Sequence, residues 1–192
     1  MKFSSNRNRI VGLAVVMALA ALFAGPSAVM AQDIATGTAT ATVQTVLTVT
    51  APTPLAFGNI MQGVKSSVGP NVDAAGGISS GIFQITGAIS AETSAYFQLP
   101  DYLWNENAGD EDRLVISFGT TDAVIDEDPA LATPSAPGAG TAVNPHALGE
   151  FNLDAVGGQA AIYLGGTVWP TVDQRALNYS ADIVLTVAYT GN

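Results

Sequence analysis

Few residues in this chain could carry out a reaction. There is one histidine, His146, and no cysteine, and residues 77–81 match the G-x-S-x-G pattern of serine hydrolases. In α/β-hydrolases that pattern works only where a strand turns sharply into a helix. The residues after Ser79 alternate like a strand instead, so the sequence predicts a Gly/Ser turn between two strands. We therefore predict no catalytic residue, and we expect His146 to be exposed to solvent without a chemical role.

Metal binding would have to rest on oxygen ligands. One histidine without cysteine cannot supply the ligands of a typical zinc site. Calcium takes oxygen ligands only, and acidic residues cluster at 101–112 and at 122–128. Neither cluster has the spacing of an EF-hand loop, so solvated loops are the favoured interpretation and calcium binding is the alternative. The calcium candidates are Asp101, Glu106, Asp110 and Asp112; no cofactor is predicted.

The first 31 residues have the pattern of a secretory signal. Lys2, Arg7 and Arg9 precede an apolar stretch at 10–23, and small residues precede a predicted cleavage between Ala31 and Gln32. The apolar stretch is shorter than the roughly 20 residues of a membrane-spanning helix. We therefore expect export to the periplasm, the cell surface or the extracellular space, with no membrane span after the signal is removed.

The charge of the predicted mature chain argues against nucleic acids and anionic membranes as partners. Only Lys65, Arg113 and Arg175 remain after cleavage, against sixteen acidic residues, which gives a formal charge of three minus sixteen, or −13. Nucleic acids and anionic membranes bind through clustered lysine and arginine, so neither is an expected partner.

Residues 32–192 are expected to form one all-β domain. Hydrophobic and polar residues alternate with period two, and Gly, Pro, Asn or Asp separate the runs. We predict an immunoglobulin-like antiparallel β-sandwich of about seven to nine short strands. The predicted strands are 38–50, 55–61, 66–72, 81–87, 94–99, 113–118, 150–153, 160–168 and 180–189.

The stretch 119–149 interrupts this pattern. It holds four of the ten prolines, seven alanines and no lysine or arginine. Because it offers few large apolar side chains for packing, we predict one long Pro/Ala-rich surface loop here, either disordered or loosely attached.

Several motifs in order resemble a known family. Leu55-Ala-Phe-Gly58, the strand Phe83-Gln-Ile-Thr-Gly87, Tyr163-Leu-Gly-Gly-Thr167 and the closing strand to Tyr189 resemble domain-of-unknown-function family 4402, which consists of small secreted bacterial β proteins. The resemblance spans about residues 42–189. It implies a secreted β-sandwich and no established activity.

The closing strand is also similar to that of chaperone-usher pilins and spore-coat-U-like proteins. The pilin resemblance implies an incomplete sandwich whose missing strand comes from the N-terminal arm of another subunit. The alternative is a complete sandwich whose first strand pairs within its own domain. The residues proposed to act at strand edges are Ala39, Ala41 and Val43 in the arm, and Ile183, Leu185, Val187 and Tyr189 in the last strand.

The sequence thus predicts a non-enzymatic structural or adhesion protein of the cell surface or extracellular space. Its partners would be other copies of itself or other surface subunits, joined by β-strand addition. The alternative is an extracellular module that binds calcium or carbohydrate through its acidic loops and exposed aromatic residues such as Tyr102, Trp104 and Trp169.

Overall fold

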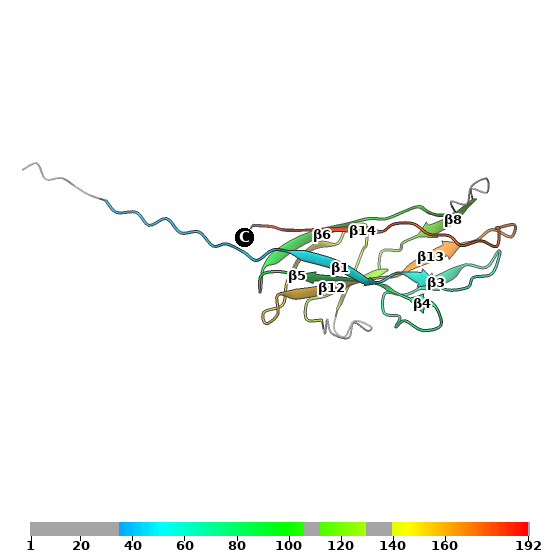
Figure 1. Ribbon diagram of the computed structural model, residues 1–192, viewed down its shortest axis with the longest axis horizontal. Helices are drawn as coiled ribbons and strands as arrows, with labels where there is room; N and C mark the ends of the chain where they lie inside the picture. Colours follow the sequence, from blue (N-terminus) through cyan, green and yellow to red (C-terminus); the bar gives the residue numbers. More distant parts are fainter. Residues whose placement is uncertain (1–34, 106–111, 130–139, 192) are drawn as a thin grey trace, which may run out of the picture. The chain divides into compact units, whose positions relative to one another are not determined.

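The computed structural model describes residues 35–105, 112–129 and 140–191. The chain divides into two compact units, Met1–Ala41 and Thr42–Asn192. The described residues of the first unit, 35–41, are exposed and contain no helix or strand. All described strands belong to the second unit, which we call the body (Figure 1).

The body is built from short antiparallel strands. The described residues form fourteen strands and no helix. The strands are β1 (Thr48–Thr53), β2 (Ala56–Phe57), β3 (Ser66–Val68), β4 (Ile78–Ser79), β5 (Gly81–Thr86), β6 (Glu92–Gln98), β7 (Tyr102–Asn105), β8 (Asp112–Ser117), β9 (Ala123–Asp126), β10 (Thr141–Val143), β11 (Gly149–Asn152), β12 (Gln159–Leu164), β13 (Gly166–Trp169) and β14 (Val184–Tyr189).

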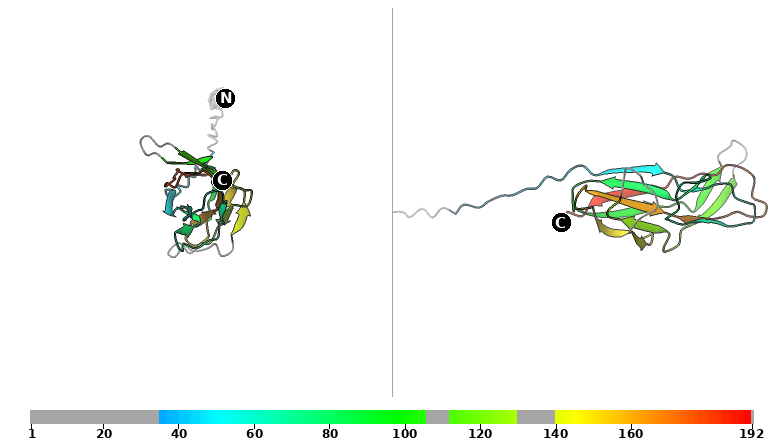
Figure 2. Two further views of the ribbon diagram at one scale, coloured as in Figure 1. Left: turned by 90° about the vertical axis from the view of Figure 1, so that its right-hand side faces the viewer. Right: turned by 90° about the horizontal axis from the view of Figure 1, so that it is seen from below.

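These strands form four sheets. The largest has the order β1-β5-β12-β9-β10, and a three-stranded sheet has the order β11-β6-β14. A four-stranded sheet, β3-β13-β8-β7, and the pair β2-β4 complete the body. Figure 2 shows these strands from the end of the body and from below.

The core lies between the five-stranded and three-stranded sheets. Ile85, Ile162 and Leu164 of the first sheet are fully buried, and they share one cluster with Ala95 and Phe151 of the second. Period-two alternation directs these side chains to one face of each sheet, so the two sheets pack face to face. The all-β prediction is confirmed, whereas immunoglobulin-like connectivity stays a prediction.

One glycine splits a predicted strand in two. The predicted strand 160–168 is β12 in the five-stranded sheet followed by β13 in the four-stranded sheet, with Gly165 between them. A Cβ at Gly165 would lie 2.4 Å from the backbone oxygen of Val68, too close for any side chain. The absence of a side chain therefore lets the chain pass from one sheet to the next against β3.

The prediction of a loop over 119–149 is wrong at β9 and β10, which are strands of the five-stranded sheet. β9 lies inside the five-stranded sheet between β12 and β10, with Ala123 and Ile125 buried. β9 is only four residues long and is flanked by a Pro/Ala-rich sequence, so its alternation was too short to indicate a strand. Residues 130–139 lie outside the described residues.

The strand count and the first strand also need correction. Fourteen described strands replace the predicted seven to nine, because β4, β7, β9 and β10 were missed and 160–168 is split. The predicted strand 38–50 begins only at Thr48. Alternation located β5, β6, β8 and β11 to within two residues.

Candidate functional site

The last strand, β14, is the edge strand of its sheet. It pairs with β6 from Val184 opposite Gln98 to Tyr189 opposite Thr93. Within the described part of the chain no strand pairs with its other side, and β1 is likewise an edge of its own sheet. An edge strand presents backbone N–H and C=O groups with which a further strand can pair.

The inward side chains of β14, and of Ile183 just before it, are only half-buried. The side chains of Ile183, Leu185, Val187 and Tyr189 alternate with exposed neighbours and pack against the main core cluster. Leu164, on a strand with neighbours on both sides, is by contrast 0% exposed. The core is therefore open to solvent along β14.

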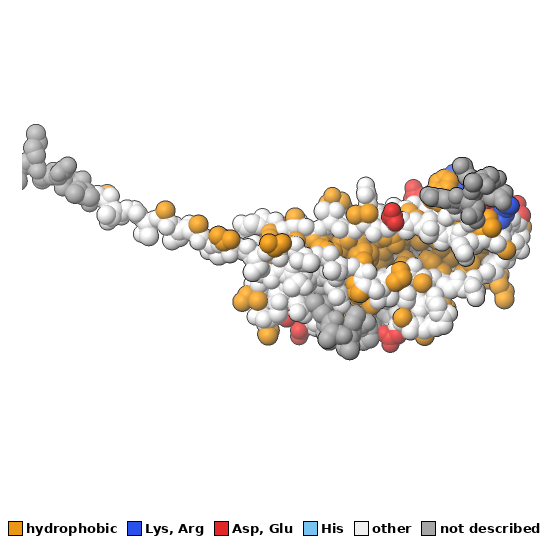
Figure 3. Space-filling view, viewed as in Figure 1, with side chains coloured by type: hydrophobic (Ala, Val, Ile, Leu, Met, Phe, Trp, Pro, Cys, Tyr) orange, Lys and Arg blue, Asp and Glu red, His pale blue; other side chains and the backbone are white. Residues whose placement is uncertain are grey.

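A groove of about 800 Å³ lies beside the start of β14. One wall is the segment 54–62, which follows β1, and the other is the segment 174–183, which leads into β14. Core side chains of the four-stranded sheet also line it, among them Leu114, Ile116 and Val168. Figure 3 shows the hydrophobic side chains as a band along the body between β14 and β1.

Tyr189 joins β14 to the segment before β1 at the other end of the strand. Its hydroxyl donates to the carbonyl oxygen of Thr45 at 2.9 Å and accepts from the amide of Ala88 at 2.7 Å. Leu47 and Tyr189 both pack against the core cluster. This hydroxyl therefore fixes the distance between β14 and the approach to β1.

Replacing Tyr189 by phenylalanine should loosen this junction. Tyr189→Phe removes both hydrogen bonds and leaves the Ala88 amide without its partner, so we expect the free energy of unfolding to fall by about 1–3 kcal/mol. Urea denaturation of the purified chain measures the loss. Tyr96→Phe is the matched control, because Tyr96 is 61% exposed on β6. Equal losses in the two variants would contradict the role assigned to Tyr189.

A hydrogen-bond network centred on Asp112 holds the second groove wall. Its carboxylate accepts from the Tyr179 hydroxyl at 2.7 Å and from the Gln174 side-chain amide at 3.0 Å. The bond from Tyr179 and the backbone amide of Arg113 lower the pKa of Asp112 below its ordinary 3.8. Burial and the same bond raise the pKa of Tyr179. Gln62 also donates to the backbone oxygen of Gln174, which ties the two walls together.

The Asp112 network should be sensitive to acid. The pKa of Asp112 is lower in the folded state than in the unfolded state. The stabilisation of the fold by its carboxylate is therefore complete above pH 3.8 and is lost as the pH falls through the lowered pKa. We expect Asp112→Asn to be less stable than the natural chain near pH 7, and we expect this difference to shrink toward about pH 2. Denaturation midpoints of both chains across this range measure it. A difference that is constant with pH would contradict the assignment.

The calcium candidates do not come together among the described residues. Asp101 and Asp112 stand at opposite ends of the β7–β8 pair, about 13 Å apart along the strands. Glu106 and Asp110 lie outside the described residues. No group of three or more His, Cys, Asp or Glu in the described ranges could hold a metal ion.

The serine and histidine of the hydrolase-like pattern have separate partners. Ser79 is in strand β4, and its buried hydroxyl donates to the carbonyl oxygen of Pro54 at 2.7 Å. The exposed ring of His146 packs edge-on against Phe118, and its Nε2 lies 3.3 Å from the Phe118 carbonyl oxygen. Strand β5, not a helix, follows the pattern, as predicted.

The remaining predicted site residues lie before β1 or outside the described residues. Ala39, Ala41 and Val43 lie before β1 in a segment without strand structure, and Val43 is 94% exposed. Ala31 and Gln32 lie outside the described residues. The walls at 54–62 and 174–183 were not predicted as a site, because only the tertiary fold brings them to one groove.

Comparison of the sequence with models of known protein families found no match, and comparison with curated proteins found none. Among the described residues, no helix is long and apolar enough to cross a membrane.

Proposed function

We propose that this chain is an exported, non-enzymatic structural subunit of the cell surface or extracellular space that assembles with other copies by β-strand addition. The observation that supports this most is the half-buried apolar face of the edge strand β14 beside an open groove. A strand laid along β14 would pair with its outer backbone groups and cover Ile183, Leu185 and Val187.

The segment 38–43 of another copy is the proposed donor. In an extended chain Ala39, Ala41 and Val43 lie on one side and threonines on the other, which suits a strand with one apolar face. Ordering six residues costs about 6–12 kcal/mol of backbone entropy. Burying Val43 contributes only about 1.5–3 kcal/mol, so a full backbone ladder and coverage of the groove side chains must supply the rest.

A peptide titration tests this assignment. A synthetic peptide of residues 38–48 should bind the chain shortened to residues 44–192 and raise its melting temperature, because a ligand of the folded state stabilises it. The matched control peptide carries Ala41→Asp and Val43→Asp, which place charges against the apolar groove. No binding, or equal binding of the control peptide, would rule out this segment as the donor.

Export is a separate part of the proposal. It is supported by the basic front, the apolar stretch and the small residues before Gln32. N-terminal sequencing of the protein recovered from outside the cytoplasm should begin at Gln32. An intact first residue, Met1, would contradict cleavage.

A further inference from the structure

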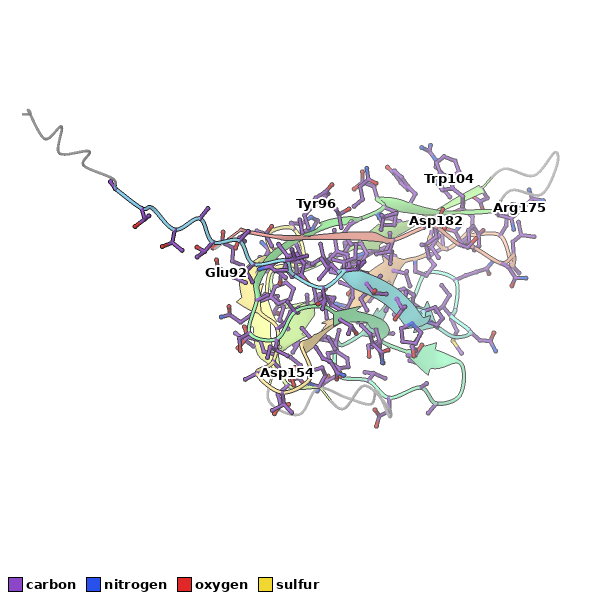
Figure 4. The ribbon with its side chains drawn as sticks, turned by 60° about the vertical axis from the view of Figure 1, so that its left-hand side comes forward. Glu92, Tyr96, Trp104, Asp154, Arg175 and Asp182 are labelled. Atoms are coloured by element: carbon purple, nitrogen blue, oxygen red, sulfur yellow. The ribbon has the colours of Figure 1, made fainter. Side chains whose placement is uncertain are left out.

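The outward face of the four-stranded sheet carries exposed aromatic side chains. Tyr102 on β7 and Trp169 on β13 both stand opposite Val115 of β8. Trp104, two residues along β7 from Tyr102, shares this face. The exposed fractions of Tyr102, Trp104 and Trp169 are 36%, 43% and 46%. Figure 4 shows Trp104 projecting outward.

Two basic side chains lie on these rings. The Arg113 guanidinium lies 5.0 Å from the Tyr102 ring centre and 5.6 Å from that of Trp104. The Lys65 ammonium lies 5.4 Å from the Trp169 ring. Cations at these distances are attracted to the ring faces and help to fix the rings. We call these residues, with Val115, the aromatic face: Lys65, Tyr102, Trp104, Arg113, Val115 and Trp169.

The charge of the aromatic face differs from that of the chain. Lys65 and Arg113 are two of the three basic residues after residue 31. None of the outward-facing described positions of β7, β8, β13 and β3 is Asp or Glu. Neither cation is ion-paired to a carboxylate among the described residues. A ligand with carboxylate groups is therefore complementary to this face.

Hydroxyl groups continue the same face. Ser117, Thr167 and Ser67 stand opposite one another on β8, β13 and β3. The Trp169 indole donates to the Ser117 hydroxyl at 2.7 Å, which holds the ring in place. Rigid rings beside hydroxyl groups suit a sugar chain, because the apolar face of a sugar stacks on a ring while its hydroxyls form hydrogen bonds.

We propose that the aromatic face binds an acidic polysaccharide, with Tyr102, Trp104 and Trp169 stacking on sugar rings and Arg113 and Lys65 binding carboxylates. Trp169 and Tyr102 are two strand spacings apart, about 10 Å, so the ligand is a chain of sugars rather than a single sugar.

A binding comparison with soluble polymers tests this proposal. The chain from Gln32 onward should bind polygalacturonate, and it should bind the neutral polymer dextran and the non-sugar anion poly-glutamate at least about tenfold more weakly. Trp169→Ala and Arg113→Gln should each weaken binding of polygalacturonate about tenfold, whereas Trp169→Phe should keep most of it. Val156→Ala is the control, because Val156 is exposed outside the aromatic face.

The other results would each overturn the proposal. No binding of polygalacturonate would exclude the ligand class. Equal binding of poly-glutamate would indicate an acidic peptide as partner, and equal binding of dextran would leave the cations without a role. Leu185→Arg should retain polygalacturonate binding, so failure of assembly and failure of sugar binding are distinguishable.

Discussion

Leu185→Arg should abolish assembly of the chain while leaving its subunit folded. Leu185 is a half-buried inward residue of β14 at the open edge of the core. A guanidinium there reaches solvent through the open edge in the isolated subunit, but an added strand would bury it without a partner. We expect assembly to weaken by a factor of a hundred or more, on the order of 3 kcal/mol. Sedimentation of the purified chain over a range of concentrations measures this.

Thr186→Arg is the matched control for this experiment. Thr186 is the next residue on the same strand, and its side chain is exposed on the outer face. An arginine there stays in solvent whether or not a strand is added, so assembly should change little. If both variants assembled like the natural chain, the open side of β14 would not be the interface.

Two leucine-to-alanine substitutions should differ several-fold in their effect on stability. Leu164 is 0% exposed on β12, whereas Leu185 is half-buried on β14. Leu164→Ala should lower the free energy of unfolding of the isolated subunit by about 2–5 kcal/mol, because it removes packed atoms and leaves a cavity. Leu185→Ala should cost only about 1 kcal/mol, because solvent already reaches that side chain.

Assembly should reduce the difference in stability cost between these two substitutions. If an added strand covers β14, the cost of Leu185→Ala rises toward that of Leu164→Ala in the assembled form. Urea denaturation of the monomer and of the assembly gives both values. If Leu185→Ala lowered the free energy of unfolding strongly in the monomer, and by the same amount in the assembly, the core would already be closed at Leu185.

Local alternation explains how much of the fold could be predicted. Strands such as β5 have a buried face that recurs at every second residue, with Phe83 and Ile85 in the core, so the sequence alone indicates them. β9 was missed because four residues beside prolines carry too short a pattern, although it lies inside a sheet. Strand pairing also determines where a strand begins, so the first strand was placed ten residues too early.

The candidate site depends on contacts that no local pattern contains. Alternation predicted that Ile183, Leu185 and Val187 face inward, but whether they are covered depends on the strands placed beside them. The wall network joins Asp112 to Tyr179, which are 67 residues apart in sequence. The aromatic face likewise needs the register of β13 against β8 before Trp169 and Tyr102 share one side.

Strand addition between copies is the central claim, and light scattering coupled to size-exclusion chromatography tests it most directly. The chain from Gln32 to Asn192 should form oligomers whose mass grows with concentration, and the chain lacking residues 32–43 should remain a folded monomer. A folded monomer in both cases would contradict strand addition, as would oligomers that persist after the deletion.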